Sequence, residues 1–143
     1  MEFPTELGIL TCLSILLATL WMPYIIGVNT APEGTLPDDA PDGFILPPNW
    51  RLHRPWVQRA YRAHMNLLEQ FVPFAVIVLL LDRVGGLNAV TYWTCIAFFW
   101  LRVAHAVGYI TGLTKFPARP IIFTLGWVCV LVLASQVFVG RMA

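Results

Sequence analysis

Four long apolar segments constrain the fold of this 143-residue chain more than any other feature of its sequence. They cover residues 7–28, 58–81, 87–112 and 121–139, and each is close to the ~20 residues that a helix needs to cross the core of a bilayer. A segment in lipid must satisfy its backbone hydrogen bonds internally, which a helix does. The short connections favour antiparallel neighbours. We therefore predict an all-α membrane protein, an antiparallel bundle of four transmembrane helices forming one domain over residues 1–143.

The composition agrees with a membrane protein. Hydrophobic residues make up 58% of the chain and charged residues 12%, whereas a soluble domain carries about 25% charged residues. The net charge of +1 and the absence of a long basic run give no reason to expect a nucleic-acid partner. The three cysteines lie in apolar segments without CxxC spacing, so the sequence predicts neither a disulfide framework nor a metal site. The first apolar segment lacks a basic residue before it, so we expect a retained span rather than a signal peptide.

One long hydrophilic connection, Asn29–Pro55, separates the first two segments and is rich in Pro, Gly and Asp, so we expect it to be irregular. Basic residues are concentrated on one side of the predicted membrane, in this connection, the helix after it and the third turn: Arg51, Arg54, Arg59, Arg62, Lys115 and Arg119. The opposite side has only Arg83 and Arg141. The excess of positive charge on cytoplasmic loops predicts that both termini are non-cytoplasmic. A bacterial inner membrane and an endoplasmic-reticulum-type membrane both fit.

A polar stripe marks the start of the second segment, in QRAYRAHMNLLEQFVP (Gln58–Pro73). At about 100° per residue, four polar side chains fall within roughly an 80° sector of the helix: Arg59, Arg62, Asn66 and Glu69. His64 points about 200° away from Arg62 on the same helix. Polar groups this deep in an apolar helix are costly unless they are paired, so the stripe predicts a functional site.

The third segment carries a second stripe, Arg102, His105 and Tyr109, within roughly a 60° sector. In an antiparallel bundle the two stripes lie at similar depth toward the cytoplasm, and Arg119 begins the fourth segment at the same end. The cations outnumber the single carboxylate, which favours an anionic ligand. A structural role remains open for each residue: Glu69 could neutralise Arg62 or Arg102, and Tyr109 could belong to an interfacial aromatic belt.

The stretches RAHMNLLEQFVPF (Arg62–Phe74) and RVAHAVGYITGL (Arg102–Leu113), followed by Arg119, resemble the signatures of the MAPEG family, the membrane-associated proteins in eicosanoid and glutathione metabolism. The resemblance covers essentially the whole chain and is closest in motif to the family's microsomal glutathione transferases. It implies a homotrimer that binds glutathione between subunits near the cytoplasmic side, without a metal. It also implies membrane lipid as surroundings and detoxification chemistry on a lipophilic small molecule.

Carried over residue by residue, the resemblance makes Arg119 the catalytic residue that stabilises the glutathione thiolate. The residues that it implies for glutathione binding are Arg62, Asn66, Glu69, His105 and Tyr109, with Arg59 and Arg102 as supporting charges. The resemblance thus implies a glutathione-dependent transferase or peroxidase that joins the thiolate to an electrophile or reduces a lipid hydroperoxide.

The sequence departs from the family pattern at three places. Pro120 and Phe123 stand where some members have a serine and a tyrosine, and the first segment lacks a cytoplasmic arginine, with Asn29 the nearest polar residue. These departures argue against prostaglandin synthesis. Two other functions remain open: a non-enzymatic relative that binds a lipid or partner protein, and a small carrier or channel subunit.

Overall fold

The computed structural model describes residues 3–30, 51, 53–113 and 117–142, without the side chains of 140–142. These residues form five helices and no strand: α1 (Thr5–Leu20), α2 (Met22–Asn29), α3 (Pro55–Val84), α4 (Ala89–Thr111) and α5 (Ala118–Met142). The prediction of an all-α chain is confirmed for this part of the chain. Most of the predicted hydrophilic connection, residues 31–50 and 52, lies outside the described residues, as does Lys115.

Among the described residues, three helical stretches are long and apolar enough to cross a membrane: Thr5–Asn29, Ala89–Thr111 and Ala118–Val139. The first joins α1 and α2, which are separated by Trp21 alone. The break falls at Trp21, and Pro23 lies in the first turn of α2, where a missing N–H costs nothing. The 30-residue α3 is not among the three stretches, so a fourth transmembrane span stays a prediction.

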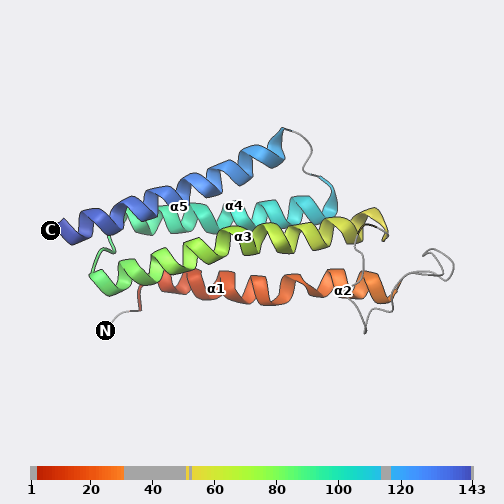
Figure 1. Ribbon diagram of the computed structural model, residues 1–143, viewed down its shortest axis with the longest axis horizontal. Coiled ribbons are helices and arrows are strands. Elements are labelled where there is room, and N and C mark those ends of the chain that lie inside the picture. Colours follow the sequence, from red (N-terminus) through yellow and green to blue (C-terminus); the bar gives the residue numbers. More distant parts are fainter. Residues whose placement is uncertain (1–2, 31–50, 52, 114–116, 143) are drawn as a thin grey trace.

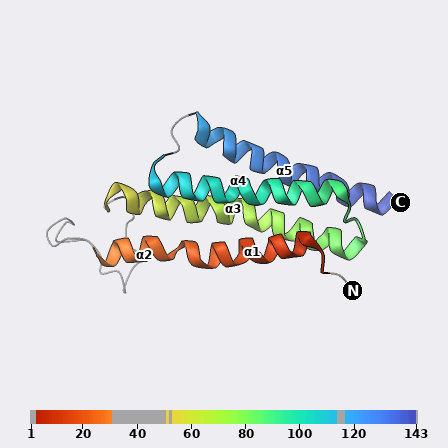
Figure 2. The same ribbon diagram turned by 180° about the vertical axis from the view of Figure 1, so that it is seen from behind.

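The helices lie side by side: α1 and α2 run in one direction, and α3, α4 and α5 then alternate in direction (Figures 1 and 2). The start of α1 and the end of α5 lie at one end of the molecule, and the ends of α2 and α4 lie at the other. The neighbouring helices α3 and α4 occupy the middle; α1 and α2 pack against α3 on one side, and α5 packs against both α3 and α4 on the other. This arrangement brings the first half of α3, the last half of α4 and the first turns of α5 to the same end.

The core is apolar and joins α1, α3, α4 and α5. Its fully buried members include Leu13, Leu67, Phe98 and Leu133. The rings of Phe74 on α3 and Phe98 on α4 are stacked, with centroids 4.2 Å apart and planes 7° apart. This contact sets the spacing of α3 and α4 one turn from the polar stripes, on the side toward the turn between the two helices.

The turn between α3 and α4 is specified by local chemistry. Gly85 ends α3 with a φ of 69°, a left-handed conformation that favours glycine. Asn88 then begins α4: its Oδ1 accepts hydrogen bonds from Val90 N at 2.8 Å and Thr91 N at 3.2 Å. Thr91 Oγ1 accepts in return from Asn88 N at 2.8 Å, which completes a capping box.

At the other end, the close approach of α2 to α3 requires Gly27. Arg54 holds the start of α3 here, because its Nη2 donates to the carbonyl oxygens of Gly27 at 3.3 Å and Thr30 at 3.1 Å. A Cβ on Gly27 would come within 2.5 Å of Val57 Cγ2 and 2.7 Å of the Trp56 ring. Real Cβ atoms do not come this close, so a larger residue would push α2 away from α3.

We therefore expect Gly27→Ala to destabilise the protein. Overpacking of this kind costs about 1–3 kcal/mol, and a thermal-unfolding scan in detergent would show it as a lower midpoint. Gly8→Ala is the matched control, because the nearest atom to its new Cβ would be Phe3 Cε1 at 3.8 Å, an ordinary contact. Equal midpoints for the two variants would contradict the close packing of α2 on α3.

Candidate active site

A shallow pocket of about 260 Å³ opens between α3, α4 and α5. Its lining comes from all three helices: Asn66, His105, Tyr109, Arg119, Pro120 and Phe123. The structure thus brings together four of the residues that the sequence singled out, although they are spread over more than 50 positions of the chain. They meet because α3 begins, α4 ends and α5 begins at the same end of the molecule.

Arg119 and Tyr109 are in direct contact at the pocket. The guanidinium carbon of Arg119 lies 4.4 Å from the centroid of the Tyr109 ring, a cation–π distance. His105 lies one turn deeper on α4, with its ring centroid 5.5 Å from that of Tyr109. Arg119 also lies in the first turn of α5, where unpaired backbone N–H groups and the helix dipole add positive potential. The pocket is therefore suited to an anion.

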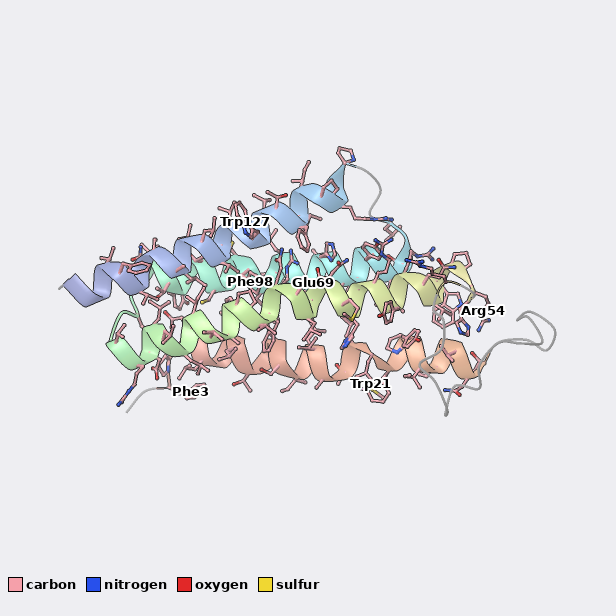
Figure 3. All side chains as sticks on the ribbon, viewed as in Figure 1. Phe3, Trp21, Arg54, Glu69, Phe98 and Trp127 are labelled. Atoms are coloured by element: carbon pink, nitrogen blue, oxygen red, sulfur yellow. The ribbon has the colours of Figure 1, made fainter. Side chains whose placement is uncertain are left out.

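Arg62, Asn66 and Glu69 lie along one face of α3 beside the pocket. Arg62 and Glu69 are exposed, and Asn66 is half-buried and reaches the pocket. Glu69 lies near the middle of the length of the molecule (Figure 3). Pro73 follows one turn later inside α3 and has no N–H to donate to the Glu69 carbonyl, so a backbone acceptor is also left open on this face.

No ion pair of the Glu69 carboxylate occurs within the described part of the chain. The choice between a structural and a functional role for Glu69 stays a prediction. If α3 spans the bilayer as predicted, a carboxylate and a guanidinium exposed on it are too costly to face lipid. A ligand or a second protein surface would then cover this face.

Arg102 does not line the pocket but lies behind it. Only 1% of its surface is exposed, and its guanidinium carbon lies 5.7 Å from the centroid of the Phe123 ring. Its Nη2 donates to the carbonyl oxygen of Ile122 at 2.9 Å. In the same way Gln70 Nε2 on α3 donates to the carbonyl oxygen of Phe123 at 2.9 Å. These two bonds connect α3 and α4 to the α5 backbone one turn after Arg119.

Gly126 makes this connection possible. A Cβ at Gly126 would collide with Gln70 Oε1 and would lie 2.6 Å from Arg102 Nη2, so only glycine leaves room for both polar ends against α5. Three buried polar atoms of this cluster have no hydrogen-bond partner among the described residues: Gln70 Oε1, Arg102 Nε and Arg102 Nη1. We name Gln70, Arg102 and Gly126 the α5 clamp.

Two further polar residues of α3, Arg59 and His64, do not line the pocket. Arg59 Nε donates to the carbonyl oxygen of Ile110 at 3.2 Å, next to the C-terminal end of α4, where a cation is favoured by the helix dipole. His64 is half-buried on α3, and its Nδ1 has no partner among the described residues. No group of His, Cys, Asp or Glu positioned to hold a metal ion occurs in this part of the chain.

Sequence reasoning missed Gln70 and Gly126. Gln70 is a polar residue next to Glu69 in an apolar helix, and this alone could have marked it as a candidate. It lies about 100° from Glu69, outside the sector that the arginines define, so its partner could not be deduced from helix geometry. Gly126 gave no signal beyond its presence in an apolar segment.

These observations define a helical integral membrane protein with a pocket, lined in part by Arg119, at one end of its helices. A comparison with protein families identifies it further: the model of the MAPEG family matches residues 8–139. The chain belongs to the MAPEG family.

Two curated relatives agree with this assignment. Microsomal glutathione S-transferase 1 of Sus scrofa is 34% identical over 86 residues, and that of Mus musculus is 33% identical over 86 residues. Each alignment covers 60% of this chain and 55% of the relative, so the similarity spans about half the length of these relatives.

Proposed function

We propose that this protein is a glutathione-dependent membrane transferase or peroxidase. The observation that carries the proposal is the pocket at which Asn66, His105, Tyr109 and Arg119 meet beside the exposed Arg62 and Glu69. Its membership of the MAPEG family and its similarity to two microsomal glutathione S-transferases support the same chemistry. Glutathione is the bound co-substrate in this account.

The charged face of α3 suits the backbone of glutathione. The tripeptide carries an ammonium group and two carboxylates; Glu69 would take the ammonium group, and Arg62 and Asn66 the carboxylates. Charge-assisted hydrogen bonds of this kind are short and strong. Because the stripe leads into the pocket at Asn66, a ligand held along it would place its thiol near Tyr109 and Arg119.

Arg119 supplies the activating charge. A free thiol has a pKa of about 8.5, so little of it is nucleophilic thiolate at neutral pH. A guanidinium beside the sulfur favours the anion and would lower the thiol pKa by about 1–3. In conjugation the thiolate then forms a C–S bond and the electrophile loses its leaving group. In peroxide reduction two glutathione molecules are oxidised to a disulfide while the hydroperoxide becomes an alcohol and water.

We further propose that the protein works as a homotrimer with four spans per chain and its pocket toward the cytoplasm. The exposed Arg62 and Glu69 support this arrangement, because a neighbouring copy would cover a face that lipid cannot. With 30 residues, α3 would be about 45 Å long, enough to cross a bilayer. The lipophilic substrate would reach the pocket laterally from the membrane.

Binding of glutathione tests the role of Glu69. We expect Glu69→Gln to weaken glutathione binding about 10- to 100-fold, because the ammonium group loses a charge-assisted partner. Isothermal titration of glutathione into the purified protein measures this change. Asp82→Asn is the matched control, because Asp82 is an exposed carboxylate at the opposite end of α3, and it should bind glutathione like the wild type.

Catalysis separates the proposal from its alternative, a non-enzymatic relative that binds a lipid or a partner protein. The purified protein should conjugate glutathione to 1-chloro-2,4-dinitrobenzene or reduce cumene hydroperoxide with glutathione. Tight glutathione binding without turnover of either probe would favour the alternative. Absence of glutathione binding altogether would remove both the cofactor and the mechanism.

A further inference from the structure

Two adjacent pockets lie at the end of the molecule that holds both termini, far from the proposed glutathione site. The first, which we name the Glu6 pocket, has a volume of about 430 Å³ and is lined by Pro4, Glu6, Leu87, Asn88, Ala89 and Tyr92. The second, which we name the Phe99 groove, has a volume of about 280 Å³, and its lining includes Phe3, Pro4, Gly8, Ile9, Cys12 and Phe99. Pro4 lines both of them. Figure 3 shows Phe3 beside the start of α1 at this end.

Glu6 is the unusual residue of the Glu6 pocket. Only 5% of its surface is exposed, and its Oε1 accepts a hydrogen bond from Thr91 Oγ1 at 2.8 Å. Within the described part of the chain no lysine or arginine pairs with it. Thr91 Oγ1 lies equally close, at 2.8 Å, to the carbonyl oxygen of Asn88, so its single proton has two acceptors. The nearby N-terminus of α4 offsets part of the charge. A buried carboxylate without a cation is costly, so the pocket is suited to a positively charged occupant.

The other walls suit a phospholipid headgroup. Tyr92 contributes an aromatic ring, which attracts an ammonium group through its π face. Ala89 is the first residue of α4, so its N–H has no acceptor within the helix and favours a phosphate. The Phe99 groove adjoins this site at Pro4, and its largely apolar lining fits an acyl chain.

The depth of the pocket agrees with such an occupant. Glu6 lies in the first turn of an apolar stretch of 25 residues, Thr5–Asn29. At 1.5 Å per residue this stretch is about 37 Å long, a little more than the ~30 Å hydrocarbon core. Its first turn therefore lies at the level of the lipid headgroups.

We propose that the Glu6 pocket and the Phe99 groove together bind one phospholipid whose headgroup carries a primary ammonium group, of the ethanolamine type. A primary ammonium group can donate hydrogen bonds to the Glu6 carboxylate, whereas the quaternary ammonium group of a choline headgroup has no N–H to donate. An anionic headgroup would meet the Glu6 carboxylate and be repelled. This site is independent of the proposed glutathione chemistry.

Native mass spectrometry of the full chain tests the proposal. The delipidated protein is mixed with equal amounts of phosphatidylethanolamine, phosphatidylcholine and phosphatidylglycerol that carry the same acyl chains. The wild type should retain phosphatidylethanolamine about tenfold better than the other two, the size of one charge-assisted hydrogen bond. Glu6→Gln keeps an oxygen that accepts from Thr91 but removes the charge, and should lower this ratio to about one. Asp82→Asn, an exposed carboxylate near the same end, should leave it unchanged.

A second variant keeps the test decisive if Glu6→Gln fails to fold. Tyr92 is 37% exposed, so Tyr92→Leu should fold and should lower the phosphatidylethanolamine preference. Equal retention of all three lipids by the wild type, or an unchanged preference in both variants, would overturn the proposal. A shift in oligomer mass with Gly8→Leu, without any change in lipid retention, would mean that a second copy of the chain fills the groove and would also overturn it.

Discussion

Arg119→Ala is expected to lower kcat for glutathione conjugation about 100-fold, the usual effect of removing one donor that stabilises a developing or bound anion. The physical reason is the loss of the cation beside the sulfur. Without it the glutathione thiol returns toward its ordinary pKa of about 8.5, and less thiolate is present at pH 7. The measurement is the initial rate of conjugation at saturating glutathione, for the wild type and the variant.

The pH profile separates activation of the thiol from a simple loss of binding. If the guanidinium lowers the thiol pKa by about 1–3, the wild-type rate rises with pH and levels off below about pH 8. In Arg119→Ala the rise should move up toward pH 8.5, and Arg119→Lys should fall between the two. Arg83→Ala, an exposed arginine at the opposite end of α3, should match the wild type. An unchanged profile in Arg119→Ala would contradict the role of Arg119.

Gly126→Ala is expected to lower both stability and activity. Its new Cβ would displace the ends of Gln70 and Arg102 and so weaken the two hydrogen bonds to the α5 backbone. Two such bonds inside a helix bundle contribute about 1–3 kcal/mol together. Because α5 carries Phe123 one turn earlier and Arg119 two turns earlier, a shift of α5 would also widen the pocket and raise KM for glutathione.

A double-mutant cycle identifies the cause of this effect. Gln70→Ala removes the oxygen with which the new Cβ collides, so the double variant Gln70→Ala/Gly126→Ala should be more stable than the sum of the single losses predicts. Thermal unfolding and KM for glutathione are measured for all four proteins. Strict additivity would mean that Gly126 does not act through the α5 clamp.

Four of the eight site residues predicted from the sequence line the pocket, and the other four, Arg59, Arg62, Glu69 and Arg102, do not. Helix periodicity placed Asn66 on one stripe and His105 with Tyr109 on another, and alternating helix directions brought Arg119 to the same end. Helix periodicity and helix direction follow from regular helix geometry, so both can be predicted from the sequence. Whether these residues bind glutathione stays a prediction.

The roles that the sequence could not predict depend on contacts between helices. Arg102 shares a stripe with His105 and Tyr109, but it lies one turn deeper, where the backbone of α5 comes close enough to accept its hydrogen bond. Arg59 lies at the end of α4, where it donates a hydrogen bond to the carbonyl oxygen of Ile110. The Glu6–Thr91 hydrogen bond joins positions 85 residues apart. Such pairings depend on the rotation of each helix about its axis, which the full core determines.

The most direct test of the central claim is an experimental structure of the full-length protein in a lipid nanodisc with glutathione. The account predicts density for the tripeptide along Arg62, Asn66 and Glu69, covered by a neighbouring copy of the chain, with the sulfur beside Arg119 and Tyr109. Glutathione bound elsewhere, or a pocket that stays empty at saturating glutathione while Arg62 and Glu69 face lipid, would contradict it.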